Sequence, residues 1–566
     1  MAAARAEADE PPLPDHPWLR DIEARSPGEL VRLRTALFDP RRQPNAQIAE
    51  QVLLEVTVDA DAAPGDRELR VASPDGLSNP LCFQVGVLPE VCEKDFTGGK
   101  AGALVDTPVL LNGQITPGES DRVRLRLRQG QRLVIQAQAR RLVPYLADAV
   151  PGWFQAVLAL YGPDGREVLW NDDYRFEPDP VLLFEVPADG LYELEVRDAI
   201  YRGRDDFVYR IAVGEFPFVT QIFPLGGREG SPVTAALGGW NLPGKTLPFD
   251  TGPGRGTIRT ALVGAPQGLC TEVRYAADAL PDVAESEPND DPGRAQAVAF
   301  PQAVNGRIGR PGDIDSFSFA GRAGQIVVAD VLARRLGSPL DAALRLVDAD
   351  GAVVAFNDDS KDPEMGLLTH HADPVLQAEL RRDGAYRVCL WDAQRQGGEP
   401  YAYRLRLRTP QPDFALRLTP SCVNVRPGQT ATFTVHALRK DGFAGDIDLR
   451  LLDAPNGFLL SGTQIAADKG SLEVKLSAPR GAPRQVFPVR LEGRARIGGE
   501  TISRHAVAAE DMMQAFLWRF LVPRQELLIA VAGSRPVPAV WRPLVPGVRL
   551  TGATPVRIPL GGTARV

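Results

Sequence analysis

Two short segments of the chain concentrate oxygen-bearing side chains of the kind that bind hard metal ions. One lies in a linker and the other at the start of a predicted strand. The side chains are Glu285, Glu287, Asn289, Asp290, Asp313 and Asp315. Calcium prefers about six to eight oxygen ligands without strict geometry. A linker that folds back on the strand would supply this set, so we predict a calcium site here; the alternative is an acidic linker that is merely solvated.

A weaker version of the pattern occurs earlier in the chain. Glu93 and Asp95 precede Glu119 and Asp121, which occupy the places of the two later aspartates. The earlier linker reads CEKDFTGGK and lacks the Pro-Asn pair of ESEPNDD. The sequence leaves open whether this earlier segment binds a cation.

Residues suited to hydrolytic catalysis are sparse. Nucleophilic and metal-dependent hydrolysis both need a positioned base or a metal-ligand set. The chain has 5 His, and neither H-E-x-x-H nor G-x-S-x-G occurs in it. His370 and His371 are adjacent, so in an extended segment they point to opposite faces. We therefore predict that the chain is not an enzyme.

Both acidic segments belong to an internal repeat. Residues 112–213 and 305–407 align with few gaps; for example, LALYGPDGREVLWNDD matches LRLVDADGAVVAFNDD. Short alternating strands between turns are typical of a β-sandwich or jelly roll, so each copy is predicted to be one such domain. Because shared turns fix shared registers, certain residues should occupy equivalent places. These pairs are Asn112 and Asn305, Tyr192 and Tyr386, and Tyr209 and Tyr403.

The first copy carries an insertion at 144–154 with three aromatic residues, Tyr145, Trp153 and Phe154. Exposed aromatic side chains on a protruding loop anchor binding partners. Buried, they would belong to the core or to a contact within the chain. We favour the second interpretation.

The rest of the chain predicts an all-β, multi-domain string of β-sandwiches with one short N-terminal helix. The helix follows from Ser26-Pro27-Gly28-Glu29, which reads as a capping box with Pro at the first helical position. From Val52 onward the apolar period is two. The predicted domains are a partial Ig-like domain with the N-terminal helix at 1–92, the first sandwich copy at 93–215, an Ig-like domain at 216–281, the second copy at 282–410, an Ig-like sandwich at 411–508, and the start of a further, truncated β domain at 509–566.

Length and charge exclude several classes of protein. A chain of 566 residues is too long for one hydrophobic core. The net charge is −8, and no basic stripe is present, which argues against nucleic acid as a partner. Apolar runs such as 527–532 are too short to span a membrane. The N-terminus lacks the apolar region of a secretory signal.

The second copy resembles the bacterial pre-peptidase C-terminal domain (PPC), a jelly-roll module found beside secreted peptidases. The matching motifs are ESEPNDD, GDIDSFSF, NDD and DGAYRV. The segment near 219–242 resembles an Ig-like IPT/TIG domain through V-x-x-I-x-P-x-G-G and G-W-N-L, and residues 52–88 resemble the second half of another. The chain also resembles large surface proteins of environmental bacteria that string such modules together.

This resemblance implies that the six side chains of the second copy chelate calcium, and it leaves the first copy in doubt because its motif departs from the pattern. It also implies an extracytoplasmic location: secreted, periplasmic or cell surface. Since no signal is present, we expect the export signal to lie upstream of this chain.

These features favour a non-catalytic structural or adhesive protein whose modules bind an extracellular protein or a matrix component. The alternative is the accessory region of a secreted peptidase, with a substrate-binding or secretion-associated role and a catalytic domain outside this chain. A hydrolase site within the chain is disfavoured by its few histidines. The oligomeric state is left open.

Overall fold

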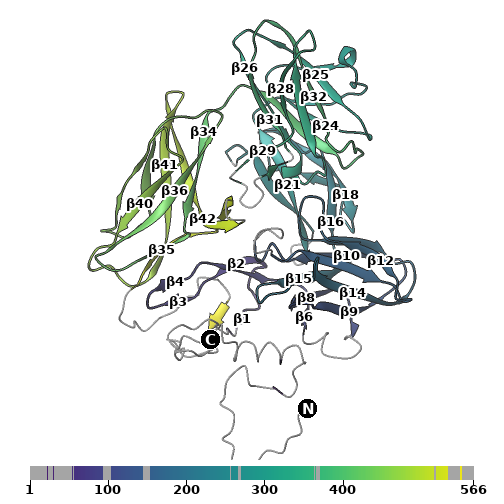
Figure 1. The fold of residues 1–566 in the computed structure, drawn as a ribbon, viewed down its shortest axis with the longest axis vertical. Helices are drawn as coiled ribbons and strands as arrows, with labels where there is room; N and C mark the ends of the chain where they lie inside the picture. Colours follow the sequence, from purple (N-terminus) through teal and green to yellow (C-terminus); the bar gives the residue numbers. More distant parts are fainter. Residues whose placement is uncertain are drawn as a thin grey trace, which may run out of the picture. The chain divides into compact units, whose positions relative to one another are not determined.

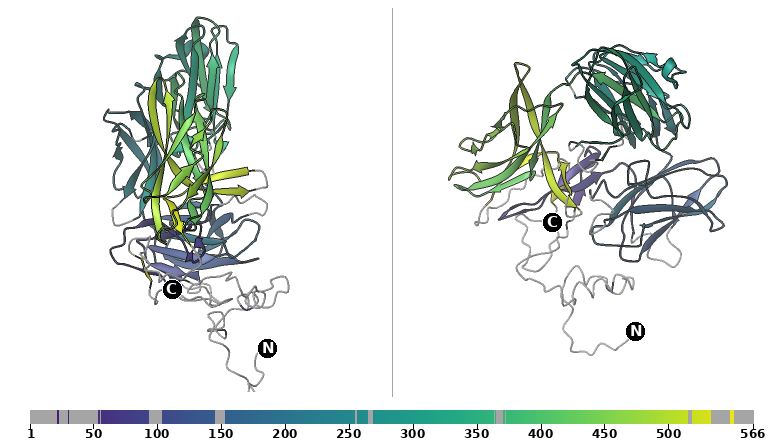
Figure 2. Two further views of the ribbon diagram at one scale, coloured as in Figure 1. Left: turned by 90° about the vertical axis from the view of Figure 1, so that its left-hand side faces the viewer. Right: turned by 45° about the horizontal axis from the view of Figure 1, so that its top comes forward.

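The computed structural model describes residues 22, 30, 54, 56–93, 104–144, 153–254, 256–264, 269–362, 364, 370–371, 373–514, 518–532 and 548–550. These residues form strands and turns with only short helical segments, which confirms the all-β prediction (Figure 1). Two further views show the same strand-built construction (Figure 2). The predicted helix after Ser26 lies outside the described residues. Within the described ranges there is no helix with the length and apolarity needed to cross a bilayer.

The chain divides into two compact units. One unit comprises Met1–Leu69, Phe83–Gly86 and Ser534–Val566. In it, β1 (Val56–Val58) pairs antiparallel with β45 (Val548–Leu550). The other unit comprises Arg70–Cys82 and Val87–Gly533 and contains both copies of the repeat.

The first copy is built from two five-stranded sheets, ordered β13-β10-β15-β8-β6 and β12-β11-β14-β9-β7. The strands are β6 (Glu90–Cys92), β7 (Leu104–Val105), β8 (Val109–Gln114), β9 (Ser120–Leu127), β10 (Arg132–Gln138), β11 (Ala156–Tyr161), β12 (Glu167–Asn171), β13 (Val181–Glu185), β14 (Gly190–Asp198) and β15 (Val208–Gly214). Inward-facing residues of both sheets form one core, in which Leu125, Leu158 and Ile211 are fully buried. Because β6 pairs with β8, this copy begins before the boundary expected at residue 93.

The second copy repeats this order strand for strand, as β31-β26-β33-β24-β22 and β28-β27-β32-β25-β23. The strands are β22 (Asp282–Ala284), β23 (Gln296–Ala297), β24 (Gln302–Arg307), β25 (Asp315–Gly321), β26 (Ile326–Leu332), β27 (Ala342–Val347), β28 (Val353–Asn357), β31 (Val375–Glu379), β32 (Gly384–Asp392) and β33 (Ala402–Arg408). The registers agree as well. Tyr209 lies opposite Gly113, and Tyr403 lies opposite Gly306. The prediction that both copies share one topology is therefore confirmed.

Two aromatic residues of the insertion pack within the first copy itself. Phe154 stacks on the fully buried Phe207, with ring centroids 5.3 Å apart. The half-buried Trp153 lies 4.1 Å from the guanidinium carbon of Arg204. Both residues therefore belong to a contact within the chain, as favoured from the sequence; Tyr145 lies outside the described residues.

The module that follows the first copy, at 216–281, has two small sheets, β16-β18-β19 and β17-β21-β20. The strands are β16 (Phe218–Phe223), β17 (Gly226–Arg228), β18 (Thr234–Trp240), β19 (Thr246–Pro248), β20 (Ile258–Gly264) and β21 (Cys270–Asp278). Its core cluster also contains Leu332, Leu336 and Ala402 of the second copy. Beside this shared core the buried Arg404 pairs with Asp278 at 3.0 Å.

The C-terminal module extends beyond the boundary expected after residue 508. Its strands are β34 (Asp413–Thr419), β35 (Cys422–Val425), β36 (Thr430–Lys440), β37 (Ile447–Leu452), β38 (Leu459–Ser461), β39 (Gln464–Ile465), β40 (Ser471–Ser477), β41 (Val486–Ile497), β42 (Glu500–Gln514), β43 (Trp518–Pro523) and β44 (Leu527–Val531). The strand β42 runs through the expected boundary, and β44 pairs with β35 and β41. Leu527 and Ile529 share one core with Phe414. The segment expected to begin a further domain thus completes this sandwich, because its apolar strand is buried by partners distant in sequence.

Candidate metal centre

The linker before the second copy is held against the sandwich as an edge strand. β22 pairs in parallel with β24, and the next N–H, that of Glu285, donates to the carbonyl of Asn305 at 3.0 Å. The side chain of Glu285 then accepts the backbone N–H of Arg307 at 2.7 Å. This pairing places the acidic segment at the end of β24, rather than free in solvent.

The two aspartates reach the same place from the start of β25. Asp313 Oδ2 accepts the N–H of Gly309 at 2.7 Å. Asp315 Oδ2 accepts the hydroxyl of Tyr403 at 2.5 Å. Both aspartates are buried, and each is therefore fixed in orientation by a donor from the sandwich.

The structure brings all six predicted side chains together. Ligand atoms of Glu285, Glu287 and Asp315 lie within 4.8 Å of one another, and so do those of Glu287, Asp290 and Asp313. Asn289 lies among them, because its side-chain amide donates to Glu285 Oε1 at 3.3 Å. A pocket gives access to the group. It is lined by Glu287, Pro288, Asp290, Gly309, Arg310 and Asp313.

Three buried oxygen atoms of the group accept no hydrogen bond in the described structure: Asn289 Oδ1, Asp313 Oδ1 and Asp315 Oδ1. Of these, Asp313 Oδ1 has an ion-pair contact with the Arg310 guanidinium at 3.6 Å. The three residues are 0%, 2% and 0% exposed. A buried acceptor without a donor costs about 1–3 kcal/mol, and more when it is charged. A cation bonded to these oxygens would remove that cost, so the residues present fit a calcium ion.

The pKa shifts of the acidic side chains also favour a bound cation. Burial raises the pKa of Asp315 to about 10, and the negative charge of Glu285 adds to the effect. Burial and the hydrogen bond with Asp290 raise the pKa of Asp313 to about 6. The same hydrogen bond lowers the pKa of Asp290. Without a cation, these carboxyl groups resist being ionised together.

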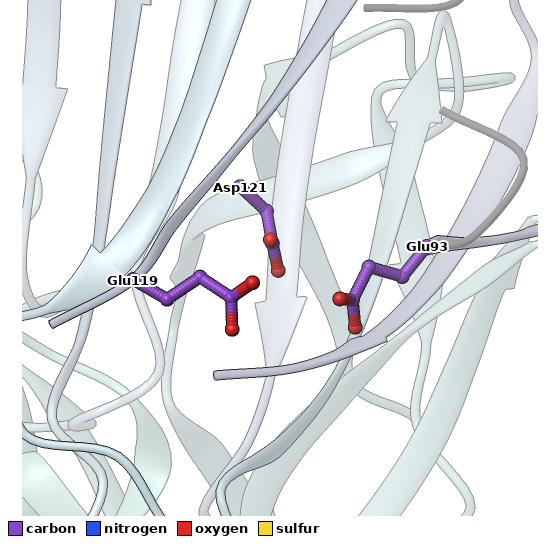
Figure 3. A group of neighbouring side chains, drawn as sticks. All are labelled: Glu93, Glu119 and Asp121. Carbon is purple, nitrogen blue, oxygen red and sulfur yellow. The ribbon is translucent and has the colours of Figure 1, made fainter. Parts of the chain in front are cut away.

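The first copy retains the central part of this arrangement. The carboxylates of Glu93, Glu119 and Asp121 point toward one another, with ligand atoms within 4.8 Å (Figure 3). Glu93 accepts the N–H of Gln114 at 2.9 Å, as Glu285 accepts that of Arg307. The other acid expected there, Asp95, lies outside the described residues.

A buried tyrosine supports each group and was not predicted to do so. Tyr209 donates to Asp121 at 2.8 Å in the first copy, in the way that Tyr403 donates to Asp315 in the second. Each tyrosine needs a glycine opposite it: a Cβ on Gly306 would lie 2.3 Å from the Tyr403 hydroxyl and 2.6 Å from Glu285 Oε2. The sequence signal was present, since the N-G pair and the tyrosine occur in both copies.

Replacing Gly306 with Ala should therefore disturb the group directly. The new methyl would displace the Tyr403 hydroxyl and the Glu285 carboxylate, and we expect a loss of about 1–3 kcal/mol in unfolding free energy, as for overpacking. Denaturant unfolding measures this loss. Gly293→Ala is the matched control, because a Cβ there meets nothing within 4 Å. Equal stability of the two variants would contradict the proposed role of Gly306.

The chain is thus a string of β-sheet modules with an acidic group where a linker meets a sandwich. No known protein-family profile matches it. A probable subtilase-type serine protease from Deinococcus radiodurans is 37% identical over 125 residues, which are 22% of this chain and 16% of the protease. The chain therefore matches only a small part of that protease.

Three solved structures that resemble parts of the chain have low sequence identity and low TM-scores. The pre-peptidase C-terminal domain of collagenase from Bacillus anthracis has 11% identity and a TM-score of 0.17, over 22% of this chain and 100% of that one. The D0-D1 domain of intimin has 11% identity and a TM-score of 0.12, over 33% and 94%. The N-terminal eight Ig domains of Down Syndrome Cell Adhesion Molecule have 10% identity and a TM-score of 0.13, over 71% and 62%.

Proposed function

We propose that this chain is a non-catalytic, extracytoplasmic, structural or adhesive multi-module protein in which calcium fastens the linker at 285–290 to the second sandwich copy. The observation that carries the proposal is the set of buried oxygen atoms without donors on Asn289, Asp313 and Asp315. Glu285, Glu287 and Asp290 complete the ligand set. The linker would be docked on the sandwich where calcium is abundant, as outside the cell, and more mobile where calcium is scarce.

Calorimetric titration of the full chain with calcium chloride tests this proposal. We expect binding with a Kd of about 10⁻⁴–10⁻³ M, the range of extracellular calcium modules. The double variant Asp313→Ala, Asp315→Ala should lose the second-copy site, whereas Glu119→Ala, Asp121→Ala reports any binding by the first copy.

The matched control is Asp348→Ala, Asp350→Ala, which removes two carboxylates from a hairpin turn of the same sandwich. This control should bind calcium like the parent chain. Absence of binding in the parent chain, or equal binding by the Asp313, Asp315 double variant, would refute the proposal.

The similarity to a subtilase-type protease favours a second candidate function. In this alternative the chain is the accessory region of a secreted peptidase, with the catalytic domain outside these residues. The reading frame of the complete gene distinguishes the two. Continuation into a peptidase domain would support the accessory role, and a frame of binding modules alone would support the structural or adhesive one.

A further inference from the structure

Aromatic and basic side chains lie next to one another on the outer face of the sheet β28-β27-β32-β25-β23. Leu344 and Leu346 lie in the core, so Arg345 between them faces outward from β27. Arg345 lies opposite Phe356 on β28 and opposite Cys389 on β32. The outward neighbours of Cys389 along β32 are then Arg387 and Trp391, which lie diagonally from Arg345.

These side chains form a continuous surface. The rings of Phe356 and Trp391 stack with centroids 6.1 Å apart, and the guanidinium carbon of Arg345 lies 5.3 Å from the Trp391 ring. Phe356 is 52% exposed, although stacked aromatic rings normally occur in cores or interfaces. Small residues lie beneath them, since Ala343 and Cys389 are buried.

The two arginines of this surface, Arg345 and Arg387, have no acidic partner among the described residues. In the described ranges neither Arg345 nor Arg387 forms an ion pair, and the Nε of each is buried without a hydrogen-bond partner. The outward positions of the neighbouring β25 hold Ser316 and Ser318, which carry no charge. Unsatisfied guanidinium donors of this kind favour a rearrangement that brings them a carboxylate.

The first copy shows that the sandwich itself does not require this arrangement. By register, Glu193 and Glu195 on β14 occupy the places of Arg387 and Cys389. There Arg122 pairs with both glutamates, at 2.7 and 3.1 Å. On this face Arg122 of the first copy is therefore paired within the chain, whereas Arg345 and Arg387 of the second copy form no ion pair in the described ranges.

We propose that this face of the second copy binds an acidic peptide segment of another protein. Tryptophan and arginine are the residues that most often supply binding energy in protein interfaces. The guanidinium groups of Arg345 and Arg387 pair with carboxylates of the peptide, and Phe356 with Trp391 covers its apolar side chains. This inference goes beyond the calcium linker and does not depend on it, because the face lies on the sheet's outer side and uses none of the acidic group.

Fluorescence anisotropy tests the proposal with the full chain and a labelled twelve-residue peptide in which Glu alternates with Val. The matched probe replaces every Glu with Gln. We expect the Glu peptide to bind at least about tenfold more tightly than the Gln peptide. Arg345→Gln with Arg387→Gln, and separately Phe356→Ser, should each weaken binding of the Glu peptide about tenfold or more.

Arg322→Gln controls for the loss of one positive charge away from this face, because Arg322 is exposed in a turn of the same sandwich. It should bind like the parent chain, and melting curves should show every variant folded. Three results would overturn the proposal: no preference for the Glu peptide, equal weakening by Arg322→Gln, or binding of polygalacturonate in place of the peptide.

Discussion

Calcium at a hundredfold excess over its Kd is expected to slow amide exchange in the linker of the second copy about a hundredfold. A ligand that binds only the docked linker stabilises that state by about 2.7 kcal/mol at this excess. The reporting amides are that of Asn289 in the linker, which donates to Glu287, and those of Arg307 and Gly309 beside it, which donate to Glu285 and Asp313. Hydrogen exchange followed by mass spectrometry, in calcium and in a chelator, measures the ratio.

The amide of Ala352 provides an internal control for this measurement. It also donates to a carboxylate, Asp348 Oδ1, at 2.9 Å, but in a hairpin turn of the same sandwich. Its exchange should be the same in both buffers. If the linker amides exchange equally with calcium and with chelator, the acidic group is a solvated linker.

Replacing Asp330 with Ala is expected to lower the unfolding free energy of the second copy by about 3–5 kcal/mol, as when one partner of a buried ion pair is removed. Asp330 is 1% exposed on β26 and accepts the Nε donors of Arg406 at 2.6 Å and Arg408 at 3.0 Å. Arg408 would still pair with Asp441, so Arg406 is the arginine left without its ion-pair partner when Asp330 is replaced. Exchange of the amides in β26 and β33 measures the loss.

The stabilisation by the Asp330 ion pairs should decrease at low pH. Burial raises the pKa of Asp330, but the charges of Arg406 and Arg408 outweigh burial and leave the pKa below its ordinary value. The contribution is therefore present at neutral pH and disappears as the pH falls through the lowered pKa. Replacing Asp330, Arg406 and Arg408 together by apolar residues should recover much of the stability. A single variant as stable as the parent chain would contradict this account.

Matching segments of residues 112–213 and 305–407 were enough to predict the repeat, and their shared turns were enough to predict a shared strand register. The acidic group was predicted from residue type and spacing together with the resemblance to the pre-peptidase C-terminal domain. The supporting Tyr403 and the glycine opposite it were not, since their contact depends on the pairing of β24 with β33. For a similar reason the sequence did not predict that β6 lies before the boundary expected at residue 93 or that β42 runs through the one expected after residue 508. The strand β6 pairs in parallel with β8, and β44 pairs in parallel with β35. Apolar periodicity within a strand does not show which other strand it pairs with.

The module at 216–281 and the second copy share one core, and this limits how either could be exchanged between genes. Leu332, Leu336 and Ala402 complete the core of the module at 216–281, and the buried Arg404 pairs with its Asp278. A fragment cut at residue 281 would leave apolar surface of that core in water, at about 25 cal/mol for each Å² uncovered. Recombination between genes could not transfer either module alone without this loss. The first copy is joined to the same module, because Phe216 and Phe218 share a core cluster with Leu110, Val134 and Ala212 of that copy. Recombination or grafting would therefore have to move both copies together with the module between them to keep these cores intact.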